Sequence, residues 1–232
     1  MSFMLRWLVT LIGILHASLA MSQSGNGLDK RTPNAYFNVE SESLAHKSDT
    51  IGGTDFGVRF AWNVGAWTGK SKNFGLGIHQ DISNMTYSQV DGTLTTAWTD
   101  FSMQYRLWWF YPKLAFGSCT FISELNGVTT VDALCTTAGG GLGIRIPIGP
   151  LVIANADVSM MNPTVTKDAS GNNAAVGSRL DFTAGALLYP KAEWIEIAMG
   201  VRYRSFSVDV NGSTFKEVVA GAYVGLGLGI TF

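Results

Sequence analysis

The residues best suited to chemistry in this sequence are His79 and Asp81. Residues two apart project from the same face of a β-strand, so the carboxylate can orient the imidazole and the imidazole can act as a general base. The same pair is more common as a satisfied part of a polar network. The sequence therefore predicts no catalytic residue, and we expect that the protein is not an enzyme.

The two cysteines, Cys119 and Cys135, flank the turn dipeptide Asn126-Gly127. If that turn also includes Val128, the two flanking segments pair so that Cys119 lies directly opposite Cys135, both on the face away from the apolar residues. We predict a disulfide, which an oxidising compartment permits and which would contribute about 3 kcal/mol. Two free thiols are the alternative. No further ligand has metal-site spacing, so we expect no metal and no cofactor.

The fold that positions these residues is indicated by the final stretch of the sequence, Val218 to Phe232. Its even positions are all apolar and its odd positions mostly small, as in a strand with one apolar face. A free strand of this kind aggregates in water, whereas lipid requires it in a closed barrel. Similar alternation predicts strands at about 34–43, 54–67, 73–85, 96–109, 113–125, 129–147, 150–160, 178–189 and 193–208.

The predicted fold class is therefore all-β: a transmembrane antiparallel up-and-down β-barrel of about ten strands. Eight strands are the alternative, if 34–43 is not a strand and two others merge. The connections at 68–72, 110–112, 149–150 and 190–192 are short, while those at 84–95, 159–177 and 208–215 are longer and polar. Short turns at one end and long loops at the other are typical of outer-membrane barrels.

Charged residues in these strands share the face opposite the apolar stripe. A charge facing lipid at mid-bilayer costs about 2–4 kcal/mol, so this face is predicted to line the lumen. Six arginines meet five carboxylates there, which favours a paired network that fills a narrow barrel over a selective pore. The predicted lumen network comprises Arg59, His79, Asp81, Asp100, Arg106, Arg145, Asp157, Arg179, Asp181, Glu196, Arg202 and Arg204.

Aromatic residues gather beside the short turns. Amphipathic rings prefer the boundary between lipid and water, so we expect a girdle at the periplasmic interface. Its predicted members are Trp67, Trp108, Trp109, Tyr111, Tyr189 and Trp194.

Composition agrees with a membrane barrel. The chain has 232 residues, of which 47% are apolar and 14% charged, against about 25% charged in soluble domains. A lipocalin-like soluble barrel is the competing interpretation. A net charge of −1 gives no basic face for nucleic acid. Residues 1–20 have the pattern of a cleaved signal peptide, 21–33 are expected to be a flexible periplasmic segment, and 34–232 the barrel.

The closing strand with its terminal Phe232 resembles that of Gram-negative outer-membrane β-barrel proteins, in which this terminus is recognised by the insertion machinery. The resemblance implies a location in the outer membrane, with its lipid and that machinery as partners. Some such barrels are enzymes, but omptin-type proteases carry an Asp pair and an Asp-x-His pair, whereas here the order is His79-Gln80-Asp81. Phospholipase-type barrels need a His-x-Ser, which His79 does not provide.

Three functions from different classes follow. The first is a structural or interaction role for a barrel with a plugged polar lumen, open to homo-oligomer formation through small lipid-facing residues such as Ala184, Ala186, Ser118 and Thr120. The second is a narrow, porin-like channel for ions or small solutes. The third is an envelope enzyme that modifies lipid or peptide.

Overall fold

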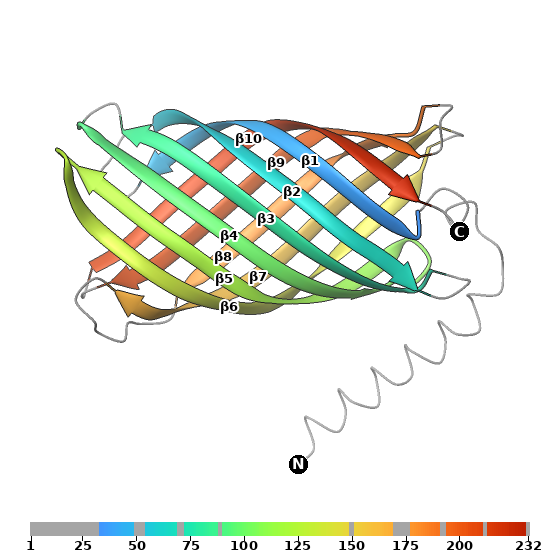
Figure 1. Cartoon of the computed structure of the whole chain (residues 1–232), viewed down its shortest axis with the longest axis horizontal. Coiled ribbons are helices and arrows are strands. Elements are labelled where there is room, and N and C mark those ends of the chain that lie inside the picture. The colour runs from blue at the N-terminus through green and yellow to red at the C-terminus, as the bar shows by residue number, and fades with distance from the viewer. Residues whose placement is uncertain are drawn as a thin grey trace, which may run out of the picture.

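The computed structural model describes residues 33–48, 54–68, 72–87, 90–148, 151–168, 177–190, 194–210 and 213–230. They form strands that close into one barrel (Figure 1). None of these residues lies in a helix long and apolar enough to span a membrane. The predicted signal peptide, all of the 21–33 segment except Pro33, and Phe232 lie outside the described residues. The strands are β1 (Ala35–Ser48), β2 (Thr54–Thr68), β3 (Phe74–Tyr87), β4 (Gly92–Tyr105), β5 (Phe110–Leu125), β6 (Val128–Pro147), β7 (Val152–Asp168), β8 (Ser178–Leu188), β9 (Ile195–Val210) and β10 (Ser213–Ile230).

Every strand pairs antiparallel with its neighbours in sequence, and β1 closes the barrel against β10. The closing ladder runs from Ala35 opposite Ile230 to Ser48 opposite Glu217. No described strand is left with an unpaired edge, as a membrane-spanning sheet requires. The predicted ten-strand barrel is confirmed and the eight-strand alternative is wrong.

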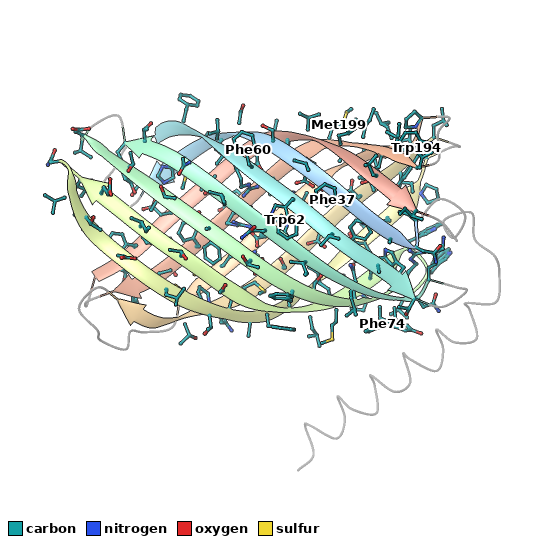
Figure 2. All side chains as sticks on the ribbon, viewed as in Figure 1. Phe37, Phe60, Trp62, Phe74, Trp194 and Met199 are labelled. Atoms are coloured by element: carbon teal, nitrogen blue, oxygen red, sulfur yellow. The ribbon has the colours of Figure 1, made fainter. Side chains whose placement is uncertain are left out.

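The outer wall is apolar. Phe37, Phe60, Phe74, Trp194 and Met199 project from it, with exposed fractions of 39% to 61% (Figure 2). Buried polar and charged side chains fill the interior instead. This arrangement inverts the pattern of a soluble protein and matches a barrel surrounded by lipid.

The strands extend further than predicted at one end of the barrel. We call the end where β1 begins and β10 finishes the proximal end, and the opposite end the distal end. The predicted loop at 84–95 shrinks to the connection between Tyr87 and Gly92, and much of the predicted loop at 159–177 belongs to β7, which reaches Asp168. The backbone ladder continues there, although the apolar alternation that marks a strand stops among Ser, Thr and Asn residues.

The hairpin between β5 and β6 reaches its register in an unexpected way. Leu125 lies opposite Val128, so the turn has two residues, and Asn126 and Gly127 take φ of 51° and 74°. Positive φ at both positions is the signature of a type I′ turn. A register shift beside Ser123 and Glu124 then adds one residue to β6. The predicted three-residue turn is wrong, since the turn has two residues. The predicted register beyond it is nevertheless reached, because the bulge supplies the third residue.

Candidate functional site

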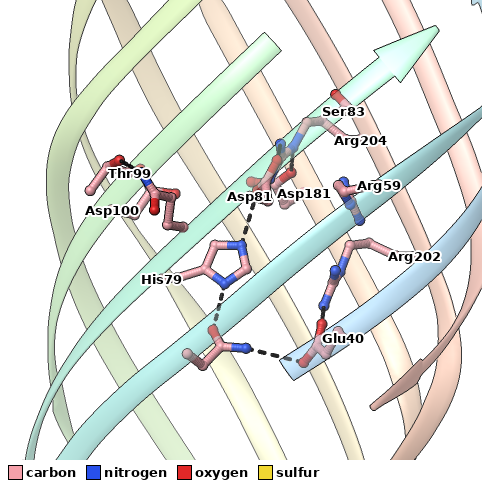
Figure 3. Close-up of polar contacts among 12 residues, drawn as sticks. Glu40, Arg59, His79, Asp81, Ser83, Thr99, Asp100, Asp181, Arg202 and Arg204 are labelled. Atoms are coloured by element: carbon pink, nitrogen blue, oxygen red, sulfur yellow. Dashed lines mark hydrogen bonds and ion pairs between the residues drawn. The ribbon is translucent and has the colours of Figure 1, made fainter. Parts of the chain in front are cut away.

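An ionic network crosses the middle of the lumen, and Arg204 on β9 is its centre (Figure 3). Its Nη1 and Nη2 each donate to one carboxylate oxygen of Asp81 on β3 at 2.9 Å. Its Nε donates to Oδ1 of Asp181 on β8 at 2.5 Å. The strands β3 and β9 are not neighbours in the sheet, so the two-pronged bond to Asp81 spans the lumen. Asp81 is fully buried and Arg204 is 4% exposed.

A second arginine carries the network to the opposite wall. Arg179 donates from Nε to Asp181 at 2.6 Å and from Nη2 to Asp100 on β4 at 2.5 Å. Thr137 on β6 donates to the same Asp100 at 3.4 Å. Each carboxylate thus has at least one guanidinium partner, which is what makes buried charge tolerable.

The network also continues from Asp81 towards β1 and β2. His79 Nε2 lies 3.0 Å from Asp81, and its Nδ1 lies 2.5 Å from Oδ1 of Asn63. Asn63 donates to Glu40 at 3.1 Å, and Glu40 accepts a 2.6 Å bond from Arg202. Both nitrogens of the His79 ring are therefore engaged by the protein itself.

The lumen on the distal side of this network is filled by apolar side chains, which we call the distal plug. Trp98 contacts Phe206 edge-on at 5.5 Å between ring centroids, and Phe121 contacts Phe206 at 5.7 Å. The plug meets the ionic network where Arg179 lies 4.6 Å over the Trp98 ring. Its buried members are Leu44, Met85, Tyr87, Leu94, Trp98, Cys119, Phe121, Val131, Ala133, Cys135, Phe206, Val208 and Val219.

A buried polar contact also lies near the distal end. His46 Nε2 is 2.5 Å from Glu217, and Ser48 donates to the other oxygen of Glu217 at 2.8 Å. The carboxylate stands between the hydroxyl and the imidazole, so the histidine is not placed to activate the serine. This arrangement joins β1 to β10 rather than forming a nucleophilic site.

The proximal side of the network is open by comparison. A cavity of about 240 Å³ lies there, lined among others by Tyr36, Tyr111 and Arg145. Lys113 donates to Asp157, and Tyr189 donates to Glu196 at 2.5 Å. The predicted lumen set therefore divides into the central network and a proximal group formed by Arg106, Arg145, Asp157 and Glu196.

The predicted aromatic girdle is only partly correct. Trp194 is 58% exposed on the outer wall, and Trp108 is 50% exposed in the turn between β4 and β5. Trp67, Tyr111 and Tyr189, however, are buried inside the barrel at the proximal end. These three share the parity of the lumen-facing residues on their strands, so the alternation itself turns them inward. Arg106 lies 4.6 Å over the Trp67 ring and Arg145 lies 5.4 Å over Tyr111, while Trp109 packs part-buried against the cluster that contains Tyr189.

Several lumen residues were not predicted. Glu40 and Glu42 on β1 are 6% and 3% exposed and bind Arg202, and Glu42 also binds Arg59. Lys113, the partner of Asp157, was missed as well. Glu40 and Glu42 share a parity opposite to Phe37 and Val39, so the same alternation could have found them.

The two cysteines occupy the predicted positions within the distal plug. Cys119 lies directly opposite Cys135 in the β5–β6 ladder, and both are buried. The structure holds them as free cysteines, so the bond itself stays a prediction.

In protein denatured without reductant, we expect neither thiol to react with an alkylating reagent. After reduction both should react, because the covalent bond is then broken. Mass spectrometry of the alkylated protein reads the difference directly. Two labels on unreduced protein would show free thiols, and a Cys135→Ser variant, which should take one label in either condition, controls for incomplete reaction.

A closed antiparallel barrel with an apolar outer wall and a charged, filled lumen defines a class: the transmembrane β-barrels of the outer-membrane type. The fold is similar to that of the outer membrane protease OmpT from Escherichia coli, with a TM-score of 0.55, 8% identity, and coverage of 90% of this chain and 100% of OmpT. The translocator domain of the autotransporter NalP from Neisseria meningitidis matches with a TM-score of 0.44, 14% identity and 95% of each chain. No protein-family model matches the sequence, and no curated protein matches it.

Within the described residues, no three or more His, Cys, Asp or Glu side chains are grouped to hold a metal ion. The acidic residues of the central network are instead directed at guanidinium groups, as in the contact of Asp81 with Arg204. The arrangement is suited to holding strands together across the lumen.

Proposed function

We propose that this protein is an outer-membrane barrel with a closed lumen, which acts through its wall and its distal surface in a structural or interaction role. The observation that carries the proposal is that two successive layers of side chains, the central ionic network and the distal plug, fill the lumen. An ion that crossed would have to separate the pair of Arg204 and Asp81 and then pass the apolar side chains of the distal plug. Apolar constrictions of this kind block conduction by excluding water.

The ends of the barrel support an orientation. Trp108 and Trp194 are exposed at the proximal end, where amphipathic rings favour the membrane boundary. The strands extend into polar segments at the distal end, and outer-membrane barrels carry their longer segments outside the cell. We assign the proximal end to the periplasm and the distal end to the exterior, with outer-membrane lipid against the wall and the insertion machinery as a partner during assembly.

An enzymatic role has less support. The name of OmpT describes a protease, but the likeness to it concerns the fold alone. His79 is the best candidate base, and its two ring nitrogens face Asn63 and Asp81. The ring lines the proximal cavity, but both of its nitrogens already have partners within the protein, which leaves neither free to take a proton from a substrate.

Recordings across planar lipid bilayers test the closed lumen. We expect the purified protein to leave the conductance at that of the bare membrane, because the apolar side chains of the distal plug fill the lumen. Insertion should be verified in the same sample by protection of the barrel from protease. Steady, reproducible current steps from the inserted protein would favour the channel function and contradict the proposal.

A further inference from the structure

Three polar side chains contact one another on the lipid-facing wall. Trp62 on β2 donates from its indole N–H to Oε1 of Gln80 on β3 at 2.8 Å. The Gln80 amide nitrogen donates to the hydroxyl of Thr99 on β4 at 3.2 Å. All three lie on the outward face, in register across the ladder, and each is part-buried.

The amide of this contact projects between apolar neighbours. Gln80 lies near the middle of β3, and it is flanked by His79 and Asp81, whose side chains enter the central network on the opposite face. The outward neighbours of Gln80 on the same strand are Ile78 and Ile82. The amide therefore stands among apolar residues on the outer wall, where lipid tails cannot satisfy a polar group.

The amide is not fully satisfied by its own chain. A glutamine amide offers two N–H donors and a carbonyl oxygen with two lone pairs. Trp62 occupies one lone pair and Thr99 one N–H, and the described residues supply no further hydrogen bond to Gln80. One donor and one acceptor of Gln80 thus remain for a partner outside the barrel, and lipid tails supply none.

The wall beside Gln80 allows another barrel to approach closely. Thr99 lies opposite Ser118 on β5, and Ser118 lies opposite Thr136 on β6, so the polar row continues across small side chains. Ser118 and Thr136 are exposed. Small residues and hydroxyl groups at lipid-facing positions are what packed membrane proteins share at their contacts.

Symmetry indicates which partner fits. Copies inserted from the same side of a membrane have the same orientation, so a two-fold axis must run along the membrane normal. Residues near such an axis then meet their own counterparts at the same depth. The remaining donor and acceptor of one Gln80 are complementary to those of another, so two hydrogen bonds can form across the axis.

We infer that the wall around Trp62, Gln80 and Thr99 is the contact surface of a two-fold symmetric homodimer. The inference rests on the proposed interaction role and supplies its partner: a second copy of this chain. The Gln80 amides pair at the axis, and the small side chains of β4 and β5 form the surrounding contact.

The full-length protein in a mild detergent tests this assignment. Sedimentation equilibrium with the detergent matched in density should give a dimer. Gln80→Leu keeps a side chain of similar size but removes both hydrogen bonds, and it should weaken association about tenfold. Met199→Leu, at an outward position on β9, three strands from β2 around the barrel and outside the proposed contact, should leave the association unchanged.

Crosslinking locates the axis independently of affinity. Under mild oxidation in membranes, Gln80→Cys should give a covalent dimer, while Met199→Cys and the unmodified chain should not, because Cys119 and Cys135 face the lumen. A monomer that does not crosslink, a trimer, or an assembly with a different protein would overturn the assignment. Conductance is measured separately. A protein that is monomeric and does not conduct would overturn the proposed dimer but would leave the proposed closed lumen in place.

Discussion

Replacing Arg204 with methionine is expected to lower the free energy of unfolding by about 3–5 kcal/mol, which is typical when one partner of a buried ion pair is removed. Arg204 is the only described partner of Asp81 that binds both of its oxygens, at 2.9 Å each. Without it Asp81 keeps His79 at 3.0 Å, whereas Asp181 keeps Arg179 at 2.6 Å. The loss should therefore come mainly from a buried carboxylate without a strong cation.

Urea unfolding in lipid vesicles, followed by tryptophan fluorescence, measures this change. Adding Asp81→Asn to the Arg204→Met variant should restore part of the stability, because the buried charge disappears with its partner. Asp132→Asn removes a carboxylate from an exposed position on β6 and should change stability by no more than about 0.5 kcal/mol. An unchanged midpoint for Arg204→Met would show that the network does not hold the strands together.

The sequence predicted the faces of the strands because lipid enforces alternation at every residue. Arg59, Arg179 and Arg204 were placed in the lumen by parity alone, and all three are buried there. The same rule, applied to Trp67 and Tyr111, would have placed them inside the barrel. Proximity to a short turn was the weaker guide, because it fixes height along the barrel and says nothing about the face.

The partners within the lumen could not be predicted in the same way. Arg204 on β9 meets Asp81 on β3, and Arg179 on β8 meets Asp100 on β4. Such contacts cross the barrel, so they depend on strand tilt and on the stagger accumulated around the closed sheet. One bulge, such as that beside Ser123 and Glu124, changes this stagger without a distinct signal in the sequence.

The distal plug was also not predicted from the sequence. Leu94, Val131 and Val208 lie on strand segments that were assigned to loops or to strand margins, where the outward residues are polar. Around these three residues the parity is reversed, with apolar side chains inward and polar ones outward, while the polar pair His46 and Glu217 is buried near the same end. This switch from an ionic to an apolar interior is what one would expect where the strands leave the membrane and their outer face meets water.

Trp98 joins the two layers, and Trp98→Ala is expected to lower the free energy of unfolding by about 3–5 kcal/mol. The indole is fully buried, contacts Phe206 at 5.5 Å and lies under Arg179 and Arg204 at 4.6 and 5.3 Å. Alanine would leave a cavity in the plug and remove the aromatic face that both guanidinium groups use. Urea unfolding in vesicles again measures the loss.

The Trp98→Phe variant distinguishes the contribution of the aromatic ring from that of the indole N–H. The indole N–H is buried and has no hydrogen-bond partner among the described residues, so its removal should cost little. Phenylalanine keeps a ring for Phe206 and a weaker face for the arginines, and we expect a loss below about 2 kcal/mol. If phenylalanine were as damaging as alanine, the N–H would have a role that the contacts do not explain. If both were harmless, Trp98 would not couple the plug to the ionic network, and the closure of the lumen would depend on the ion pairs alone.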